Sequence, residues 1–379
     1  MSLLKRLMLA FIVFLGVSAA FCAAWLSFPE LKTVVGSAAE FAATLTIPQG
    51  AQMLFTAMAS ISSQTGSSQK TGGSSAGETV AAGSSSTSSS QKGSSSSLAA
   101  SAVTSADSAS KNGLFPVKTV QFLTSEGVSD ETYGGICVYN QTTSHKPDIK
   151  NQLAIRPDIH LDKTSGPQVL IIHTHTTESY ASSYTGFYNP NSPTRSTDKT
   201  KGVVRVGDEI AMALEANGIS VIHDTNYHDY PDFNDAYAKT LTDIQSDLKE
   251  YPSIQVVLDI HRDAIQYSDG TRAKPTAVIN GKKAAQVMIV APCDESTSLP
   301  IPGWLYNYRF GLRLQQKMQQ LYPGLARPLN LCPRRYNMQV SHGSLLVEFG
   351  TDVNTLDEAT YAGQLFGNAL SQVLLSLKG

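Results

Sequence analysis

The sequence predicts an α/β domain over residues 114–379, built on a mainly parallel sheet that is covered by helices on both faces. Short apolar runs rich in valine and isoleucine alternate there with longer stretches of helical period. Polar residues gather at the ends of several apolar runs, where the ligands of such sheets also collect. Upstream of this domain, the composition predicts a transmembrane helix followed by a disordered linker.

Five apolar runs are expected to form strands. The first of them, QVLIIHTH, is a short buried run that follows a Gly-Pro turn. The expected strands are residues 168–175, 219–224, 253–263, 284–292 and 344–354.

Four amphipathic stretches are expected to form the helices that connect or follow these strands. The first is closed by Gly218, a residue that commonly stops a helix. The expected helices are residues 202–219, 235–252, 304–324 and 356–377.

Residues 1–28 are expected to anchor the chain in the cell membrane. Lys5 and Arg6 precede an uncharged apolar run that ends near Leu26, which is about the length of a membrane-spanning helix. Because positive charges remain on the cytoplasmic side, the chain is predicted to cross once and to carry an extracytoplasmic domain. The alternative is a cleaved signal peptide, since VSAAFCA offers small residues for cleavage.

Residues 29–113 are expected to link the anchor to the domain. Most of this segment is rich in serine and glycine, and such a composition cannot bury enough apolar surface to offset the entropy of the chain. We therefore expect a tether that lets the domain work at some distance from the membrane.

Charge and cysteine content exclude several classes of function. The formal net charge of -2 gives no reason to expect binding of nucleic acid, which normally selects a basic face. The four cysteines form no CxxC pair, which argues against a cysteine zinc site and against a disulfide scaffold.

Metal-ligand residues cluster after the first predicted strand, in HTHTTESY. His175 and Glu178 form a His-x-x-Glu pair, and His261 lies near the end of a later strand. Two imidazoles and a carboxylate are the zinc ligands of thermolysin and carboxypeptidase A. The sequence therefore predicts Zn²⁺ bound by His175, Glu178 and His261.

His173 is the rival to His175 as a ligand. Residues two apart in an extended segment face the same side, so either histidine could reach the metal. His175 is preferred for its spacing to Glu178, which leaves His173 as a rival ligand or as a residue that orients one.

Glu348 is the candidate catalytic residue, because it interrupts the apolar strand LLVEFG. A carboxylate at this position could accept a proton from water. The alternative is a buried glutamate that is paired with Arg334 or Arg335. Arg262 and Tyr180 are candidates for binding the substrate.

Several blocks of this domain resemble stage II sporulation protein P, a family of membrane-anchored cell-wall hydrolases of endospore-forming bacteria. The blocks are HTHTTESY, HDTNYHDYPDFNDAY, VVLDIHRDA, WLYNYRFGLRLQQKMQQLYPGLARP and RRYNMQVSHGSLLVEFGTDVNTLDEA. The resemblance covers residues 114–379 and implies an amidase/carboxypeptidase-like fold.

The resemblance also implies an activity and a cofactor. The family is related to zinc-dependent N-acetylmuramoyl-L-alanine amidases, which remove stem peptides from the glycan strands of peptidoglycan, and is known for endopeptidase activity on cross-links. Their histidine and catalytic-glutamate blocks match His261 and Glu348. Their ligand glutamate at the start of a helix has no counterpart in KGVVRVGDEIAMAL, so Glu178 is expected to replace it.

Partners and a biological setting follow from the same resemblance. The family acts in sporulation engulfment with stage II sporulation protein D, a lytic transglycosylase, and with stage II sporulation protein M, a membrane protein. Two alternatives stay open: a metallocarboxypeptidase that acts on stem peptides, and a module that binds or scaffolds peptidoglycan without cutting it.

Overall fold

The computed structural model describes residues 113–123, 130–161, 166–295 and 300–378. The predicted anchor and almost all of the predicted linker therefore lie outside the described residues. Within the described part, no helix combines the length and the apolar character needed to cross a membrane.

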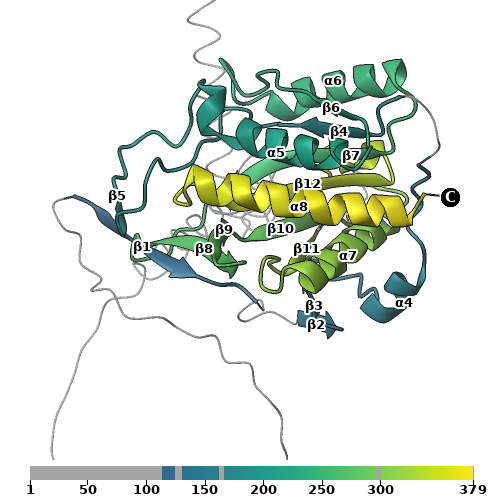
Figure 1. Cartoon of the computed structure of the whole chain (residues 1–379), viewed down its shortest axis with the longest axis horizontal. Helices are drawn as coiled ribbons and strands as arrows, with labels where there is room; N and C mark the ends of the chain where they lie inside the picture. Colours follow the sequence, from purple (N-terminus) through teal and green to yellow (C-terminus); the bar gives the residue numbers. More distant parts are fainter. Residues whose placement is uncertain (1–112, 124–129, 162–165, 296–299, 379) are drawn as a thin grey trace, which may run out of the picture. The chain divides into compact units, whose positions relative to one another are not determined.

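The larger sheet has eight strands in the order β2-β3-β11-β10-β12-β7-β4-β6 (Figure 1). All five predicted strands belong to it, as β4, β6, β7, β10 and β12. In chain order, its strands are β2 (Asp130–Tyr133), β3 (Ile136–Asn140), β4 (Val169–Ile172), β6 (Val221–His223), β7 (Val256–Asp263), β10 (Val287–Pro292), β11 (Leu329–Cys332) and β12 (Gly343–Thr351).

This sheet is mixed, which corrects the prediction of a mainly parallel sheet. Strands β12, β7, β4 and β6 run parallel to one another, but β10 pairs antiparallel with β12, and β2 pairs antiparallel with β3. A parallel neighbour needs a crossover connection, usually a helix. Residues 264–286 contain no helix between β7 and β10, and they form a hairpin instead.

That hairpin belongs to a smaller sheet of four strands in the order β5-β1-β8-β9. Its turn is Asn280-Gly281, where both residues have positive φ (51° and 77°), as a two-residue hairpin turn requires. The strands are β1 (Phe115–Val120), β5 (Phe187–Tyr188), β8 (Arg272–Ile279) and β9 (Lys282–Ala285).

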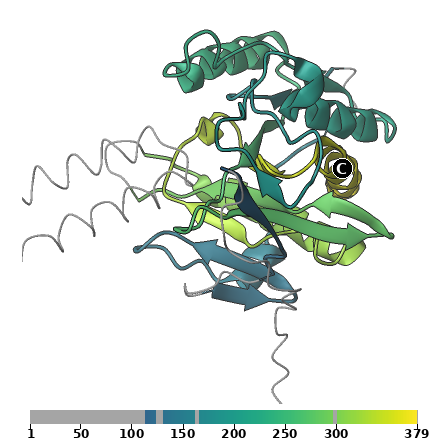
Figure 2. The same ribbon diagram turned by 90° about the vertical axis from the view of Figure 1, so that its left-hand side faces the viewer.

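Helices cover both faces of the larger sheet, and the four predicted helices are present. The long helices are α5 (Val203–Glu215), α6 (Ala236–Glu250), α7 (Trp304–Leu321) and α8 (Leu356–Ser376). The short ones are the α-helix α4 (Ile149–Ala154) and the 3-10 helices η1 (Lys199–Lys201) and η2 (Met338–Val340). Helices α5, α7 and α8 lie side by side over one face (Figure 1). The view in Figure 2, turned by 90°, looks along α8 and shows α6 on the other side of the sheet.

The two faces follow from the alternation of side chains along each strand. Val169 and Ile171 of β4 join the large core beneath α5, α7 and α8. Leu170 and Ile172 of the same strand pack with Ile244 of α6 on the opposite face. We call these the three-helix face and the α6 face.

Candidate active site

The predicted site residues of β7 and β12 lie on the α6 face. On β7, Leu258 and Ile260 enter the core of the three-helix face, so Asp259 and His261 point the other way. On β12, Glu348 lies opposite His261 in the register of the two strands. The strands therefore bring His261 and Glu348 together from positions that are far apart in the sequence.

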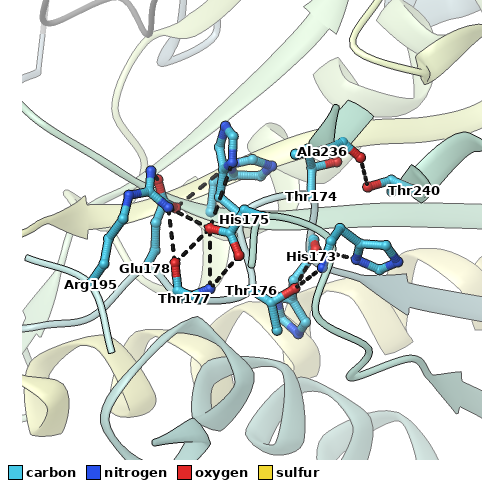
Figure 3. A network of polar contacts seen from close by, with 12 residues as sticks. His173, Thr174, His175, Thr176, Thr177, Glu178, Arg195, Ala236 and Thr240 are labelled. Atoms are coloured by element: carbon cyan, nitrogen blue, oxygen red, sulfur yellow. Dashed lines mark hydrogen bonds and ion pairs between the residues drawn. The ribbon is translucent and has the colours of Figure 1, made fainter. Parts of the chain in front are cut away.

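A turn after β4 separates His173 from His175. The strand ends at Ile172, and residues 174–177 form a turn in which the Glu178 N–H donates to the carbonyl of His175 (3.0 Å). The expectation that both histidines share one side of an extended segment is therefore wrong. In Figure 3, the ring of His173 lies apart from Glu178 and Arg195.

His173 points toward α5, and both of its ring nitrogens have hydrogen-bond partners on neighbouring strands. Nδ1 donates to the carbonyl of Ile260 (3.0 Å), and Nε2 accepts from His223 Nε2 (2.8 Å). Gly207 of α5 allows this close approach, since a Cβ there would lie 2.9 Å from His173 Nε2. Burial and the neighbouring His223 lower the pKa of His173 to about 3.

His175 is held in an aromatic setting. Its ring stacks on Phe233, with centroids 4.7 Å apart, and meets the ring of His261 edge to face at 5.3 Å. Nδ1 lies 3.9 Å from Asp229 Oδ2 and has no hydrogen-bond partner within the described residues. Burial lowers the pKa of His175 to about 4, so the imidazole is neutral, as a metal ligand must be.

His261 lies between carboxylates. Its Nε2 is 2.9 Å from Asp259 Oδ1, and its Nδ1 is 3.6 Å from Glu178 Oε2. Burial acts to lower the pKa of His261, but the charges of Asp259 and Glu178 outweigh burial and raise it to about 9. Thr174 fixes Asp259 by donating from its backbone N–H (2.8 Å) and its hydroxyl (2.6 Å).

Glu178 is buried and charged. Its Oε2 accepts from the backbone N–H of Arg262 (3.1 Å), and its Oε1 lies 3.5 Å from Arg195 Nη2. Burial by itself raises the pKa of this carboxyl, but the positive charges of Arg262 and His261 hold it below its usual value.

Glu348 is a buried carboxyl with a raised pKa. Its Oε2 is buried and has no hydrogen-bond partner within the described residues. Burial and the neighbouring carboxylate of Asp263 raise the pKa of Glu348 to about 8. Such a carboxyl can exchange a proton near neutral pH.

Tyr180 and Arg262, the predicted substrate-binding residues, are both buried. The hydroxyl of Tyr180 donates to the carbonyl of Phe349 (3.0 Å). The guanidinium of Arg262 donates to the carbonyls of Ser179 (3.2 Å) and Thr194 (2.9 Å). In the structure, these side chains hold the loops around the site.

Arg195, Asp229 and Phe233 complete the site, and sequence analysis did not find them. Arg195 Nη1 binds Asp229 Oδ2 (2.5 Å), and its guanidinium covers the ring of Phe233 at 4.6 Å. Asp229 also accepts from the hydroxyl of Thr177 (2.6 Å). These residues come from loops without a regular spacing of apolar residues. Asp229 and Phe233 lie in the block HDTNYHDYPDFNDAY, whereas nothing in the sequence marks Arg195.

A second group of ligand-type residues lies toward α6. One ligand atom each of Asp224, His228 and Asp243 lies within 4.8 Å of the others, and no other such group is found in the described part of the chain. His228 Nδ1 donates to the carbonyl of His173 (2.8 Å), while Nε2 lies 3.1 Å from Asp243 Oδ2. The same Nε2 lies 3.8 Å from Asp224 Oδ2, so it faces both aspartates.

The fold and site can be compared with known proteins. The family model described as Stage II sporulation protein P matches residues 59–371. The curated Stage II sporulation protein P of Bacillus subtilis (strain 168) is 28% identical over 216 residues, which cover 54% of this chain. The match spans 50% of that relative, so the chain covers about half of the relative's length.

The solved structures that match part of this chain include two amidases. The N-acetylmuramoyl-L-alanine amidase AmiC2 of Nostoc punctiforme has a TM-score of 0.31 at 13% identity, covering 56% of this chain and 98% of that one. The CwlD amidase of Clostridioides difficile, solved in complex with the GerS lipoprotein, has a TM-score of 0.34 at 12% identity, covering 55% and 98%. The match of the family model to residues 59–371 is decisive, and this chain belongs to the Stage II sporulation protein P family.

Proposed function

We propose that this protein is a zinc-dependent peptidoglycan hydrolase, an N-acetylmuramoyl-L-alanine amidase that removes stem peptides from glycan strands. The observation that carries the proposal is the meeting of His175, Glu178 and His261 beside Glu348, a buried carboxyl that lacks a hydrogen-bond partner among the described residues. Membership of the family supports the same substrate.

The three predicted ligands are residue types that bind zinc, although the described part of the chain brings three ligand atoms within 4.8 Å of one another only at Asp224, His228 and Asp243. His175 is neutral and Glu178 is ionised, which are the forms that bind metal. The carboxylates around His261 raise its pKa to about 9, so this imidazole would have to release a proton to bind zinc. Asp259 lies at Nε2 of His261, in the place of the carboxylates that orient metal-bound histidines. The Nδ1 atom of His261, on the side of Glu178, is then the ligand atom. A zinc ion held there supplies Lewis-acid polarisation of the scissile carbonyl and lowers the pKa of water.

Glu348 moves the proton in the proposed reaction. Its Oε2 accepts a proton from the attacking water and passes it to the nitrogen of the leaving L-alanine. The raised pKa of Glu348, about 8, suits both steps, because the carboxyl gains and loses a proton near neutral pH.

The cellular setting is part of the proposal. We place the domain outside the cytoplasm, on a single-pass membrane anchor formed by residues 1–28. Through the family, we propose a role in sporulation engulfment, with partners like stage II sporulation protein D and stage II sporulation protein M. Endopeptidase cleavage of cross-links is proposed as a second activity of the same site.

The two alternative functions, a carboxypeptidase and a binding module, require different side chains at the site. A carboxypeptidase needs an arginine to hold a terminal carboxylate, for which Arg262 and Arg335 are the candidates. Backbone carbonyls occupy the guanidinium of Arg262, which leaves Arg335 for that role. A module that only binds peptidoglycan has no need for a carboxyl such as Glu348 beside the ligands.

Metal analysis combined with digestion of defined muropeptides tests the proposal. The full chain should bind one zinc ion, and free glycan with intact stem peptides should appear as products. His261→Asn should lose the metal under competition with a chelator, because one of the three protein ligands is removed.

His228→Asn is the matched control, since His228 belongs to the other group of ligand-type residues. This variant should retain zinc. The proposal would be contradicted if His228→Asn lost zinc while His261→Asn kept full occupancy. That result would assign the metal to Asp224, His228 and Asp243.

A further inference from the structure

Three ligand-type side chains meet beside α6, outside the candidate active site. Asp224 follows β6, His228 lies on the loop after it, and Asp243 lies on α6. One ligand atom of each lies within 4.8 Å of the others, and the described residues contain this one group of that kind. The proposed hydrolysis uses none of the three side chains, so their convergence needs an explanation of its own.

The contacts of His228 show which of its ring nitrogens carries a proton. The residue is buried, with an exposed fraction of 1%. Its Nδ1 lies 2.8 Å from the carbonyl oxygen of His173, and because a carbonyl only accepts, Nδ1 is the donor. In the neutral ring, Nε2 is then an acceptor without a proton. Metal-bound histidines have the same arrangement, since their second ring nitrogen commonly donates to a backbone carbonyl.

Nε2 of His228 faces two groups that are acceptors themselves. Asp243 Oδ2 lies 3.1 Å away and Asp224 Oδ2 lies 3.8 Å away. The other oxygen of Asp224 accepts from the backbone N–H of Asn226 (2.7 Å), so Oδ2 is the oxygen that remains for the imidazole. An acceptor nitrogen beside two carboxylates is unfavourable unless a positive charge lies among them. That charge is either a proton on Nε2 or a metal ion.

Two cations lie on the segments around this group, and both have other partners. Lys199 of η1 donates to the hydroxyl of Thr225 (3.2 Å) and lies over the ring of Tyr227 at 4.7 Å. Arg195 binds Asp229. Neither cation forms an ion pair with the two aspartates of the group, whose charged partner is the imidazole. The side chains of Lys199 and Arg195 therefore do not supply the positive charge that the group needs.

A further carboxylate adds to the negative charge at this place. Asp247 lies one turn beyond Asp243 on α6. Partial burial and the carboxylates of Asp224 and Asp243 raise the pKa of Asp247 above its usual value. A divalent ion relieves such repulsion more than one proton does, because it carries twice the charge.

We propose that Asp224, His228 and Asp243 hold a second divalent cation, at a site separate from the proposed zinc site. Two carboxylates and one imidazole suit Mn²⁺, because carboxylates are the ligands that this ion prefers and imidazole is a common ligand of transition metals. The side chain of Asp243 is 38% exposed, so water can complete the coordination on that side.

The cation would fasten α6 to the turn that carries the proposed zinc ligands. His228 is joined to that turn, because its backbone N–H donates to Thr176 Oγ1 (3.3 Å) and its Nδ1 donates to the carbonyl of His173. Asp243 belongs to α6. An ion bound by both residues links two segments that are distant in sequence, and it stabilises the folded state because the unfolded chain has no such group.

Titration with Mn²⁺, followed by electron paramagnetic resonance, tests the site. The full chain loaded with one equivalent of zinc should bind Mn²⁺ saturably, and its melting temperature should rise with the Mn²⁺ concentration. Asp243→Asn should weaken binding by at least about tenfold, since even residues that only orient a ligand contribute about 10–100-fold. This variant keeps the shape of a partly exposed side chain, so the fold should be retained. His228→Asn should also lose Mn²⁺.

Asp158→Asn is the matched control. Asp158 also contacts two imidazoles, those of His160 (2.9 Å) and His342 (2.6 Å), but it is not part of the group of three. This variant should bind Mn²⁺ like the wild type. His261→Asn, which removes a proposed zinc ligand, should keep the Mn²⁺ site as well, and this result would show that Mn²⁺ does not bind in place of the zinc.

Two results would overturn the proposal. Absence of saturable Mn²⁺ binding in the wild type would mean that a proton on His228 is the charge between the aspartates. Equal binding by the wild type and Asp243→Asn would place the ion elsewhere. If the wild type binds no Mn²⁺ and His228→Asn also loses zinc, zinc itself fills the group, and both this site and the proposed zinc ligands are wrong.

Discussion

The two faces of the larger sheet are built from the same strands and serve different purposes. On the three-helix face, β7 and β12 contribute Leu258, Ile260, Val347 and Phe349 to one apolar core. On the α6 face, the intervening positions include His261 and Glu348. The comparison teaches that alternation along a strand lets one segment contribute both stability and chemistry.

Two buried histidines, His173 and His261, show how strongly the surroundings shift the pKa of an imidazole. His173, directed toward α5, has a pKa lowered to about 3 by burial and by His223. His261 is also buried, yet Asp259 and Glu178 raise its pKa to about 9. Charged neighbours, more than burial alone, separate the two.

Substitution at Glu348 should have the largest effect on activity and little effect on the fold. Glu348→Gln preserves the shape of the side chain but cannot accept a proton, so turnover should fall about 10²–10⁴-fold. Release of dye from labelled cell wall measures turnover, while zinc content and melting temperature serve as controls. A folded, zinc-loaded variant with near wild-type turnover would remove Glu348 from the mechanism.

Substitution at Phe349, the next residue along β12, should have the opposite pattern. Phe349 is fully buried and meets Phe366 of α8 edge to face at 5.3 Å. Phe349→Ala should cost about 3–5 kcal/mol of unfolding free energy, because it leaves a cavity in the core. Denaturant unfolding measures the loss, and the folded fraction at low temperature should remain active. Unchanged stability with lost activity would show that the two faces are not separate in function.

The stability of the metal-free protein should fall as the pH drops below about 6.5, the ordinary pKa of a histidine. His173 in the unfolded chain binds a proton near that pH, whereas folded His173 binds one only near pH 3, so the unfolded state holds more protons between these values. The effect is at most about 1.4 kcal/mol per pH unit for one histidine.

Denaturant midpoints between pH 7.5 and 5, measured with a chelator present, test this effect. His173→Asn should show a shallower slope than the wild type. Of the groups that remain, His175 has a lowered pKa and makes stability fall as the pH drops, whereas Glu348 has a pKa raised to about 8 and makes it rise, so these two oppose each other. Equal slopes in the two proteins would mean that His173 is not held neutral by the fold.

Element type was predictable from the sequence, but the sheet topology was not. The spacing of apolar residues along the sequence predicted strands β4, β6, β7, β10 and β12 and the four long helices. The direction of β10 depends on the connection that precedes it, and Asn280-Gly281 within that connection is a local hairpin signal. The short strands β2, β3, β5, β9 and β11 have too few residues for a regular spacing of apolar residues to be recognised. Strands β1 and β8 are longer, but each contains a proline, which argues against a strand.

For the site, the sequence by itself determined which residue types stand at the strand ends: His175, Glu178, His261 and Glu348. Their spacing and the apolar runs around them already predicted a metal-ligand group, because polar residues in such runs are costly without a partner. The tertiary structure alone decided that His173 turns toward α5, and that Arg262 and Tyr180 are buried. It also decided that residues 224–235 reach His175. These outcomes depend on a turn after β4 and on contacts between distant loops. Neither produces a regular spacing of apolar residues that could be recognised in the sequence.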